Sequence, residues 1–328
     1  MRLLWLLPAF AIVVLTSIAI RYTQMPVKNQ SEQLEPLSEK EVAASRRLRA
    51  DVTMLAETIG GRDAVKYSAL GKAADYIAGE LQSASYTAER QWFSADGKEF
   101  QNIEAELHGT TRPEQLIIVG AHYDTAGGLP GANDNASGVA ACLQLARKVS
   151  GMKLNSSIRW VFFTNEEPPY FQSAAMGSMV YAKRCHDRKE RIAAMLSLET
   201  IGYYSGERGS QTYPISFHPG YPDRGDFLGF VANFRSSALL RSALRSFRSA
   251  TSLPAVGAAA PASIPGIGWS DHWSFWQFGY RALMLTDTAP YRYPYYHTAQ
   301  DTPDKLDYDR LARAVTGIEA IVRNLASD

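Results

Sequence analysis

Short apolar runs that end in metal-ligand residues constrain the fold of this chain more than any other feature. Leu116–Val119 is continuously apolar, rich in β-branched residues and closed by Gly120, a pattern typical of a strand buried on both faces of a parallel sheet. His122 and Asp124 follow it closely. Open α/β sheets bind ligands beyond the carboxyl ends of their strands. The pattern therefore predicts an α/β fold with a site at this edge of the sheet.

Polar residues also follow three further apolar runs, at residues 158–164, 193–198 and 282–285. Glu166 and Glu167 come after the first run, and Glu199 comes after the second. The third run leads into a Tyr-rich loop that ends at His297. We expect these side chains to gather at one edge of the sheet, because the carboxyl ends of parallel strands lie together.

The residue types at these positions indicate a metal centre. Asp134 adds a further carboxylate, in the segment just before the helical pattern of Val139–Val149. Two histidines and several carboxylates without a thiolate suit zinc in a catalytic role. A bridging carboxylate with two more ligands on each side would hold a pair of metals. Taken singly, a His-x-Asp pair also fits a loop histidine with a hydrogen-bonding neighbour, and paired glutamates also fit a solvated loop.

Length and charge limit the other classes of function. The 328 residues can form one large domain, or one domain with a small appendage. The net charge is +1 and no run of lysine and arginine is long enough to form a basic stripe, so we expect no nucleic-acid partner. The two cysteines, Cys142 and Cys185, exclude a cysteine-based zinc site, and we expect two buried free thiols.

The N-terminal residues predict contact with a membrane. Leu3–Ile20 is an uninterrupted apolar stretch of 18 residues between Arg2 and Arg21, which just reaches the roughly 17 to 25 residues that cross a bilayer. It lacks a clear cleavage site, so we favour an uncleaved anchor over a secretory signal peptide. Either choice places the rest of the chain on the extracytoplasmic side. We expect an anchor or signal over 1–22, a polar tether over 23–41 and a catalytic domain over 42–328.

Six segments then resemble the motifs of a known family in order and spacing, namely AHYDT, GANDNASG, NEEP, LETIGY, SDHWSFW and YHTAQDTPDKLD. From about Val42 to its end, the chain resembles the zinc exopeptidases that include bacterial leucyl aminopeptidase, aminopeptidase Y, glutamate carboxypeptidase and, as a divergent branch, glutaminyl cyclase. The resemblance implies a three-layer α/β sandwich with a mixed, mostly parallel central sheet flanked by helices. It also implies a metal-dependent exopeptidase, most simply an aminopeptidase acting on peptides with a free N-terminus.

The resemblance assigns roles residue by residue. It implies two zinc ions, with one still open, held by five ligands: His122, Asp134, Glu167, Glu199 and His297. Asp134 would bridge the metals, Glu167 and His297 would complete one site, and the other two ligands would complete the second. The resemblance makes Glu166 the general base and Asp124 a catalytic partner that orients His122. The family commonly has Asp where this chain has Glu199, so we expect the longer side chain to weaken the second site.

Other positions carry alternatives. We expect Asp271, Tyr295 and Tyr296 to bind substrate, and His272 fits either a site residue or a core histidine. Asp301 and Asp304 either support the ligands or cap the last helix. The alternative functions are a one-zinc glutaminyl cyclase, a catalytically dead binding module of the transferrin-receptor kind, and a carboxypeptidase that uses Arg292, which is otherwise simply solvent-exposed.

Between these motifs the periodicity predicts helices and strands that complete the domain. These predictions are a helix around residues 48–55 stopped by 59–62, a helix over 69–83, a hairpin of strands 86–93 and 100–107 joined through Asp96-Gly97, two helices within 227–247, a mobile loop over 255–265 and a helix over 308–325.

Overall fold

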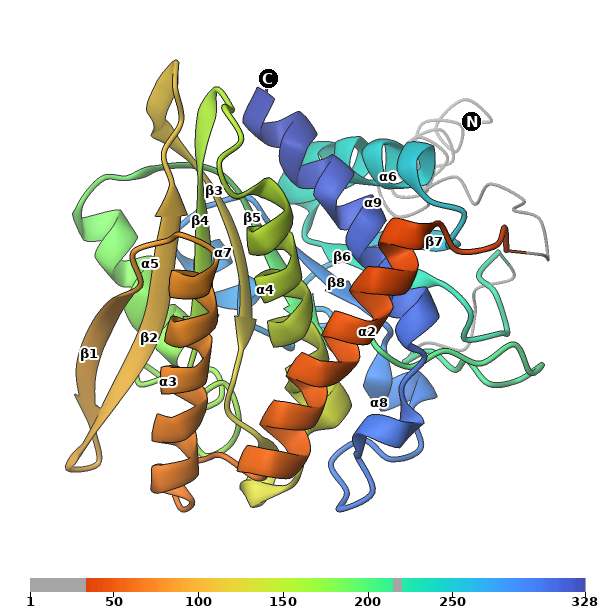
Figure 1. Ribbon diagram of the computed structural model, residues 1–328, viewed down its shortest axis with the longest axis horizontal. Coiled ribbons are helices and arrows are strands. Elements are labelled where there is room, and N and C mark those ends of the chain that lie inside the picture. The colour runs from red at the N-terminus through yellow and green to blue at the C-terminus, as the bar shows by residue number, and fades with distance from the viewer. Residues whose placement is uncertain (1–33, 215–219, 328) are drawn as a thin grey trace, which may run out of the picture.

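The computed structural model describes residues 34–214 and 220–327, and an eight-stranded sheet runs through its middle (Figure 1). The strand order is β1-β2-β4-β3-β5-β8-β6-β7. The strands are β1 (Glu89–Ala95), β2 (Lys98–Leu107), β3 (Arg112–His122), β4 (Ser156–Phe163), β5 (Arg191–Glu199), β6 (Leu228–Ala232), β7 (Ala255–Ala259) and β8 (Ala282–Thr286). β4, β3, β5 and β8 run parallel to one another, and the flanking pairs β1–β2, β2–β4 and β6–β8 are antiparallel. The predicted mixed, mostly parallel sheet is confirmed.

Helices cover both faces of the sheet and give the predicted three layers. The helices longer than one turn are α2 (Glu39–Thr53), α3 (Tyr67–Ser83), α4 (Gly138–Val149), α5 (Gly177–Asp187), α6 (Ser237–Ala250), α7 (His272–Gln277) and α9 (Tyr308–Ser327). The main hydrophobic core lies under α2, α3, α4, α6 and α9, and a smaller core lies under α5 and α7 on the opposite face (Figure 1). Cys142 belongs to the first core and Cys185 to the second, and both are free thiols, as expected.

β3 shows how the sequence places the site. Ile117 and Val119 pack into the main core while Ile118 packs into the smaller one, so the strand is apolar on both faces. In the parallel register His122 lies opposite Phe163 of β4, and Gly120 lies opposite Ser197 of β5. The residues that follow these strands therefore emerge at the same edge of the sheet.

Two sequence predictions in the C-terminal half are wrong. The segment 227–247 begins with a strand, β6, which is followed by a single 3₁₀ turn, η5 (Phe234–Ser236), and one α-helix, α6, in place of the two predicted helices. β6 lies between β8 and β7 and all five of its residues are buried, a setting in which a short apolar run pairs as a strand although its periodicity also fits a helix. The predicted mobile loop over 255–265 begins with β7, whose residues pair with β6 from Leu228↔Ala255 onward.

The first described helix begins slightly before the predicted domain start at residue 42. α2 begins at Glu39, because Ser38 and Glu41 form a reciprocal capping box. The predicted anchor over 1–22 and most of the tether lie outside the described residues. Within 34–214 and 220–327, no helix combines the length and apolar character that a membrane span requires. The anchor stays a prediction.

Candidate metal centre

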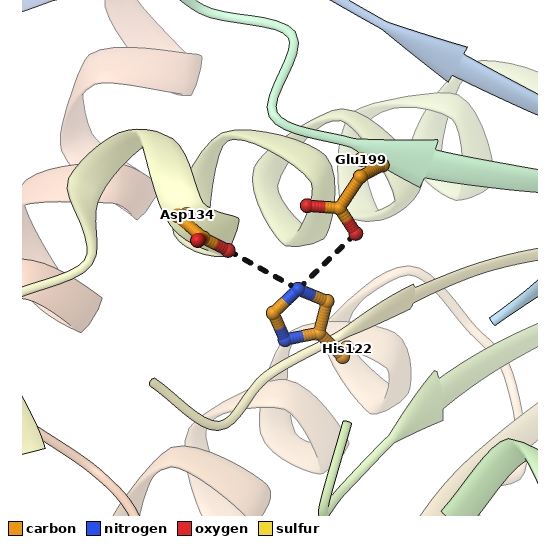
Figure 2. A group of neighbouring side chains, drawn as sticks. All are labelled: His122, Asp134 and Glu199. Atoms are coloured by element: carbon orange, nitrogen blue, oxygen red, sulfur yellow. Dashed lines mark ion pairs between the residues drawn. The ribbon is translucent and has the colours of Figure 1, made fainter. Parts of the chain in front are cut away.

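A first group of ligand atoms forms where β3 and β5 end. His122 is the last residue of β3, Glu199 is the last residue of β5, and Asp134 comes from the segment η4 (Ala132–Ser137) that precedes α4. Figure 2 shows the ring of His122 directed between the two carboxylates. His122 Nε2 lies 3.3 Å from Asp134 Oδ1 and 3.2 Å from Glu199 Oε2. All three side chains are buried.

A second group shares Asp134. Its other oxygen, Oδ2, lies 3.0 Å from His297 Nε2, which in turn lies 3.3 Å from Glu167 Oε1. Within each group the ligand atoms lie within 4.8 Å of one another, close enough to contact a single ion. One carboxylate thus stands between two possible cation sites, and the structure brings together all five predicted ligands.

Several buried atoms of these two groups lack a hydrogen-bond partner, and a bound metal ion would supply one. Three buried atoms within the two ligand groups have no hydrogen-bond partner in the described part of the chain: His122 Nε2, Asp134 Oδ1 and Glu167 Oε1. Buried polar atoms without partners cost free energy, so they are rare in folded proteins. His122 Nε2 and Asp134 Oδ1 belong to the first group and Glu167 Oε1 to the second, so a cation bound in each group would satisfy all three.

The pKa shifts of the ligand residues show that carboxylates outnumber positive charges in the two ligand groups. Burial and the neighbouring Asp134 raise the pKa of Glu167 to about 7, although both imidazoles oppose the rise. Burial raises the pKa of Glu199 despite the opposing charge of His122. For His122 burial acts to lower the pKa, but Glu199 and Glu166 outweigh it and raise the pKa well above its usual value. Without a metal these groups take up protons, and metal binding would release them.

In Asp134 and His297, the attraction between opposite charges outweighs burial and favours the ionised form of each side chain. Burial acts to raise the pKa of Asp134, yet hydrogen bonds from His122 and His297 outweigh burial and lower it. The pKa of His297 rises to about 10 against the effect of burial, because Asp134 and Glu167 favour its charged form. Asp134 is therefore the carboxylate that stays ionised most readily.

Glu166 stands beside both groups and belongs to neither. Its Oε2 lies 4.0 Å from His122 Nε2, and 6% of the residue is exposed. Burial raises its pKa well above the usual value, and Glu199, Glu167 and Asp271 add to the rise while His122 opposes it. Of the adjacent pair, Glu167 contributes an oxygen to a ligand group and Glu166 does not, and the predicted role of Glu166 as general base stays a prediction.

Asp124 supports this arrangement through the backbone as well as through His122. Its carboxylate lies 3.5 Å from His122 Nδ1, and its backbone oxygen lies 3.2 Å from the same nitrogen. The two carboxylate oxygens accept the backbone N–H groups of Glu166 and Glu167, each at 3.1 Å. Asp124 lies next to His122 as predicted, and it also fixes where the Glu166–Glu167 pair leaves β4, which the sequence did not show.

Asp301 holds the segment that carries Asp134. Its carboxylate oxygens accept the backbone N–H groups of Asn133 at 2.8 Å and Asp134 at 3.1 Å. Of the two alternatives for Asp301, the structure therefore favours support of the ligands. Asp307 caps α9, accepting from Arg310 N at 2.9 Å. Asp304, the other candidate cap, bonds instead to Thr302 and Lys305 at the surface.

Sequence reasoning missed two further supports of the ligands. Ser270 donates a hydrogen bond of 2.8 Å to Glu199 Oε2 and lies 2.9 Å from Ser197 Oγ. Asn133 donates to Asp287 Oδ2 at 2.9 Å and accepts from Gly202 N at 2.9 Å, so η4 is tied to the chain after Glu199. Ser270 and Asn133 both lie inside recognised motifs, so the motif boundaries were the available signal.

The residues predicted to bind substrate lie in three different environments. Tyr296 stacks on His297 with ring centroids 3.9 Å apart, and burial together with the charges of Asp134 and Glu167 raises its pKa. Tyr295 packs away from this cluster, against Tyr293 at 5.5 Å and beneath the ammonium group of Lys305. Tyr296 therefore lies beside the candidate metal centre, whereas Tyr295 is part of the surrounding loop packing.

Asp271 does not fit its predicted contact with substrate. It is fully buried, so it offers no surface to a bound peptide. Burial raises its pKa to about 7, and the charges of Glu199 and Asp124 add to the rise while His122 opposes it. Asp271 therefore lies inside the fold, where its charge acts on Glu199 and His122 and not on the solvent.

His272 and Arg292 are structural residues. His272 is fully buried, its Nε2 lies 2.8 Å from the oxygen of Ile267, and burial lowers its pKa to about 4, as expected for a core histidine. Arg292 is buried and donates to Gln211 Oε1 and to the backbone oxygen of Phe227, both at 2.8 Å. The suggestion that it is solvent-exposed is wrong, and its bonds inside the fold leave it unsuited to hold a substrate carboxylate.

Comparison with known proteins identifies the family. The model of peptidase family M28 matches residues 102–322. The chain belongs to peptidase family M28. This confirms the resemblance to zinc exopeptidases that the motifs indicated. The match includes every residue of the two ligand groups.

The similar proteins include one uncharacterised relative and two proteins of known structure. The M28 chain is 36% identical to the uncharacterised protein YfbL of Escherichia coli K12, over 86% of this chain and 88% of YfbL. Its fold is similar to BSAP, a zinc aminopeptidase from Bacillus subtilis, with a TM-score of 0.68 and 16% identity over 87% of this chain and 95% of BSAP. It is also similar to the glutaminyl cyclase of Fimbriiglobus ruber, with a TM-score of 0.63 and 16% identity over 91% of this chain and 99% of the cyclase.

Proposed function

We propose that this protein is a two-zinc aminopeptidase that removes N-terminal residues from peptides, with Glu166 as the general base. The observation that carries the proposal is the position of Asp134, which directs one oxygen to each of two ligand groups while Glu166 stands outside both. Membership of peptidase family M28 supports it. The excess of buried carboxylates supports two divalent cations over one.

The proposed chemistry divides between the metals and the side chains. Zinc in such a centre supplies Lewis acidity toward water and toward the scissile carbonyl. Glu166 accepts the proton of the attacking water and passes it to the leaving amine, a task that its raised pKa and its free carboxylate suit. Asp124 keeps Glu166 in place by binding its backbone N–H. His122, Asp134, Glu167, Glu199 and His297 hold the metals.

Tyr296 has a separate role in this proposal. Its phenol keeps its proton at neutral pH because burial and the surrounding carboxylates both disfavour the phenolate. A protonated phenol beside the centre can donate a hydrogen bond to the carbonyl oxygen of a bound peptide as negative charge develops there. The free N-terminal amine of the peptide would be held by the surplus acidic groups, which makes the enzyme an exopeptidase.

A glutaminyl cyclase is the second candidate, because the fold matches the Fimbriiglobus ruber enzyme along nearly its whole length. That function would need the same general base and at least one metal. A catalytically inert binding module is the third, and the complete set of ligands and base argues against it.

One experiment separates the three. The full-length protein is loaded with zinc, its metal content is measured, and it is offered aminoacyl-amides together with a peptide that has N-terminal glutamine. We expect two zinc ions per chain and release of free amino acids. One zinc per chain with a pyroglutamyl peptide and ammonia as products would favour the cyclase, and bound zinc without any turnover would favour the binding module.

A further inference from the structure

Arg62 is a fully buried arginine in the turn that precedes α3. The turn follows α2 and its π-helical extension η2 (Met54–Ile59). The sequence pattern predicted only a helix stop there. Arg62 precedes residues 102–322, which match the family model. Among the described residues it forms no ion pair. Its side chain instead donates to backbone carbonyls, and three of these belong to the loop that connects His122 to Asp134.

These three bonds span the loop. Arg62 Nε donates to Tyr123 O at 2.7 Å, Nη1 donates to Pro130 O at 2.7 Å, and Nη2 donates to Gly131 O at 2.9 Å. Tyr123 follows His122 directly, and Gly131 comes three residues before Asp134. One planar guanidinium group therefore joins the start of the loop to its end, next to a proposed ligand on each side.

The backbone around Arg62 adds to this clamp. Its N–H donates to Thr125 Oγ1 and its carbonyl accepts from Thr125 N, both at 3.0 Å. Lys66 Nζ donates to Gly128 O at 2.7 Å. Gly61 packs so closely that a Cβ atom there would lie 1.8 Å from the same oxygen of Gly128. The N-terminal turn thus contacts the loop at its start, middle and end.

Arg62 remains charged in this position. Burial lowers its pKa to about 10, and the charges of Asp301, Asp124 and Asp134 oppose the decrease. Its positive charge therefore also partly balances the acidic groups that hold and surround the centre, while its hydrogen bonds fix the backbone.

We propose that Arg62 is a positioning residue of the metal centre, which sets the distance between His122 and Asp134 by bridging the two ends of their connecting loop. The inference rests on the proposed metal-binding function. Lysine keeps the charge but not the rigid fork, so it cannot bridge Tyr123 and Gly131 in the same way. Supports of metal ligands typically contribute about 10- to 100-fold to metal affinity.

The test measures zinc affinity by competition with a chromophoric chelator in the full-length parent, Arg62→Lys and Arg313→Lys. Arg313 is the matched control, because it is buried and bonds to Ser252 and the Glu35 carbonyl, away from the ligands. We expect Arg62→Lys to bind zinc at least about tenfold more weakly, and Arg313→Lys to keep the parent's affinity even where its melting temperature falls.

Two results would overturn the inference: a folded Arg62→Lys with the parent's zinc affinity, or an equal loss of affinity in Arg313→Lys. If Arg62→Lys does not fold, Gly61→Ala decides, because it displaces the Gly128 carbonyl without removing the charge; unchanged zinc affinity in that variant would also overturn the inference. A parent that binds no zinc would contradict the proposed function itself, which is a different result.

Discussion

Two clusters of buried or half-buried carboxylates in this protein differ in how their charge is balanced. The candidate metal centre has six carboxylates and two imidazoles: Asp124, Asp134, Glu166, Glu167, Glu199 and Asp271 with His122 and His297. No lysine or arginine among residues 34–214 and 220–327 forms an ion pair with any of them. The second cluster, here the Glu104 cluster, has three carboxylates and two arginines: Glu104, Glu106 and Glu190 with Arg159 and Arg184.

The balance decides the direction of the pKa shifts. Burial acts to raise the pKa of Glu104, but Arg184 donates to both of its oxygens, at 2.6 and 2.8 Å, and the pKa falls. In the metal centre burial raises the pKa of Glu166 and Glu199, and no arginine in the described chain pairs with either carboxylate to offset it. The Glu104 cluster is complete as folded and serves stability. The metal centre needs cations from outside the chain, which is what a binding site requires.

The largest expected effect tests the catalytic side of this comparison. Glu166→Gln should lower kcat by about 10²- to 10⁴-fold, since it removes the proton acceptor. It should keep two zinc ions per chain, since Glu166 lies outside both ligand groups. Metal analysis and steady-state kinetics on the same preparation measure both. Loss of zinc in this variant would show that Glu166 and Glu167 have exchanged roles.

The next effect tests the Glu104 cluster. Arg184→Met leaves Glu104 buried without its main partner, so the free energy of unfolding should fall by about 3 to 5 kcal/mol. Urea denaturation measures this change. The zinc content and kcat of the folded variant should equal those of the parent, and a reduced zinc content would show that the two clusters are not independent.

A smaller effect comes from His272, which is fully buried against Trp276 and bonds to the backbone oxygen of Ile267. Its folded pKa of about 4 lies below its usual value of 6.5, so the unfolded chain binds more protons between these pH values. Stability should therefore be lost as pH falls from about 6.5 to about 4, by about 3 kcal/mol in total. The free energy of unfolding in urea should therefore fall between pH 6.5 and pH 4 by about 3 kcal/mol less in His272→Phe than in the parent. An equal slope in both proteins would contradict the assignment.

The smallest effect concerns one hydrogen bond within the metal centre. Ser270→Ala removes the bond to Glu199 Oε2, so the zinc bound by the His122 group should weaken by about tenfold. Zinc titration of the metal-free protein should show one step moved and the other unchanged. Movement of both steps would mean that Ser270 supports the fold of the whole centre.

The sequence alone determined the middle strands of the sheet and which residues gather at their carboxyl ends. β3, β4 and β5 are apolar on both faces, so their strand character did not depend on distant partners, and the ligands follow them within a few residues. The assignment of the five ligands to two metal sites came from the family motifs, because the local sequence pattern alone did not determine it. Where a segment's structure depends on its neighbours, as in β6 and β7, the sequence prediction was wrong.

Only the tertiary structure decided how the ligands are held and which acidic groups are reachable. Asp271 and Glu166 are both acidic residues in family motifs, yet the fold encloses the first completely and leaves 6% of the second exposed, 4.0 Å from His122 Nε2. Arg62 bonds to residues more than 60 positions away, and no local pattern indicates such a contact. Burial and long-range hydrogen bonds are properties of the packed chain, because they depend on which distant segments the core brings together.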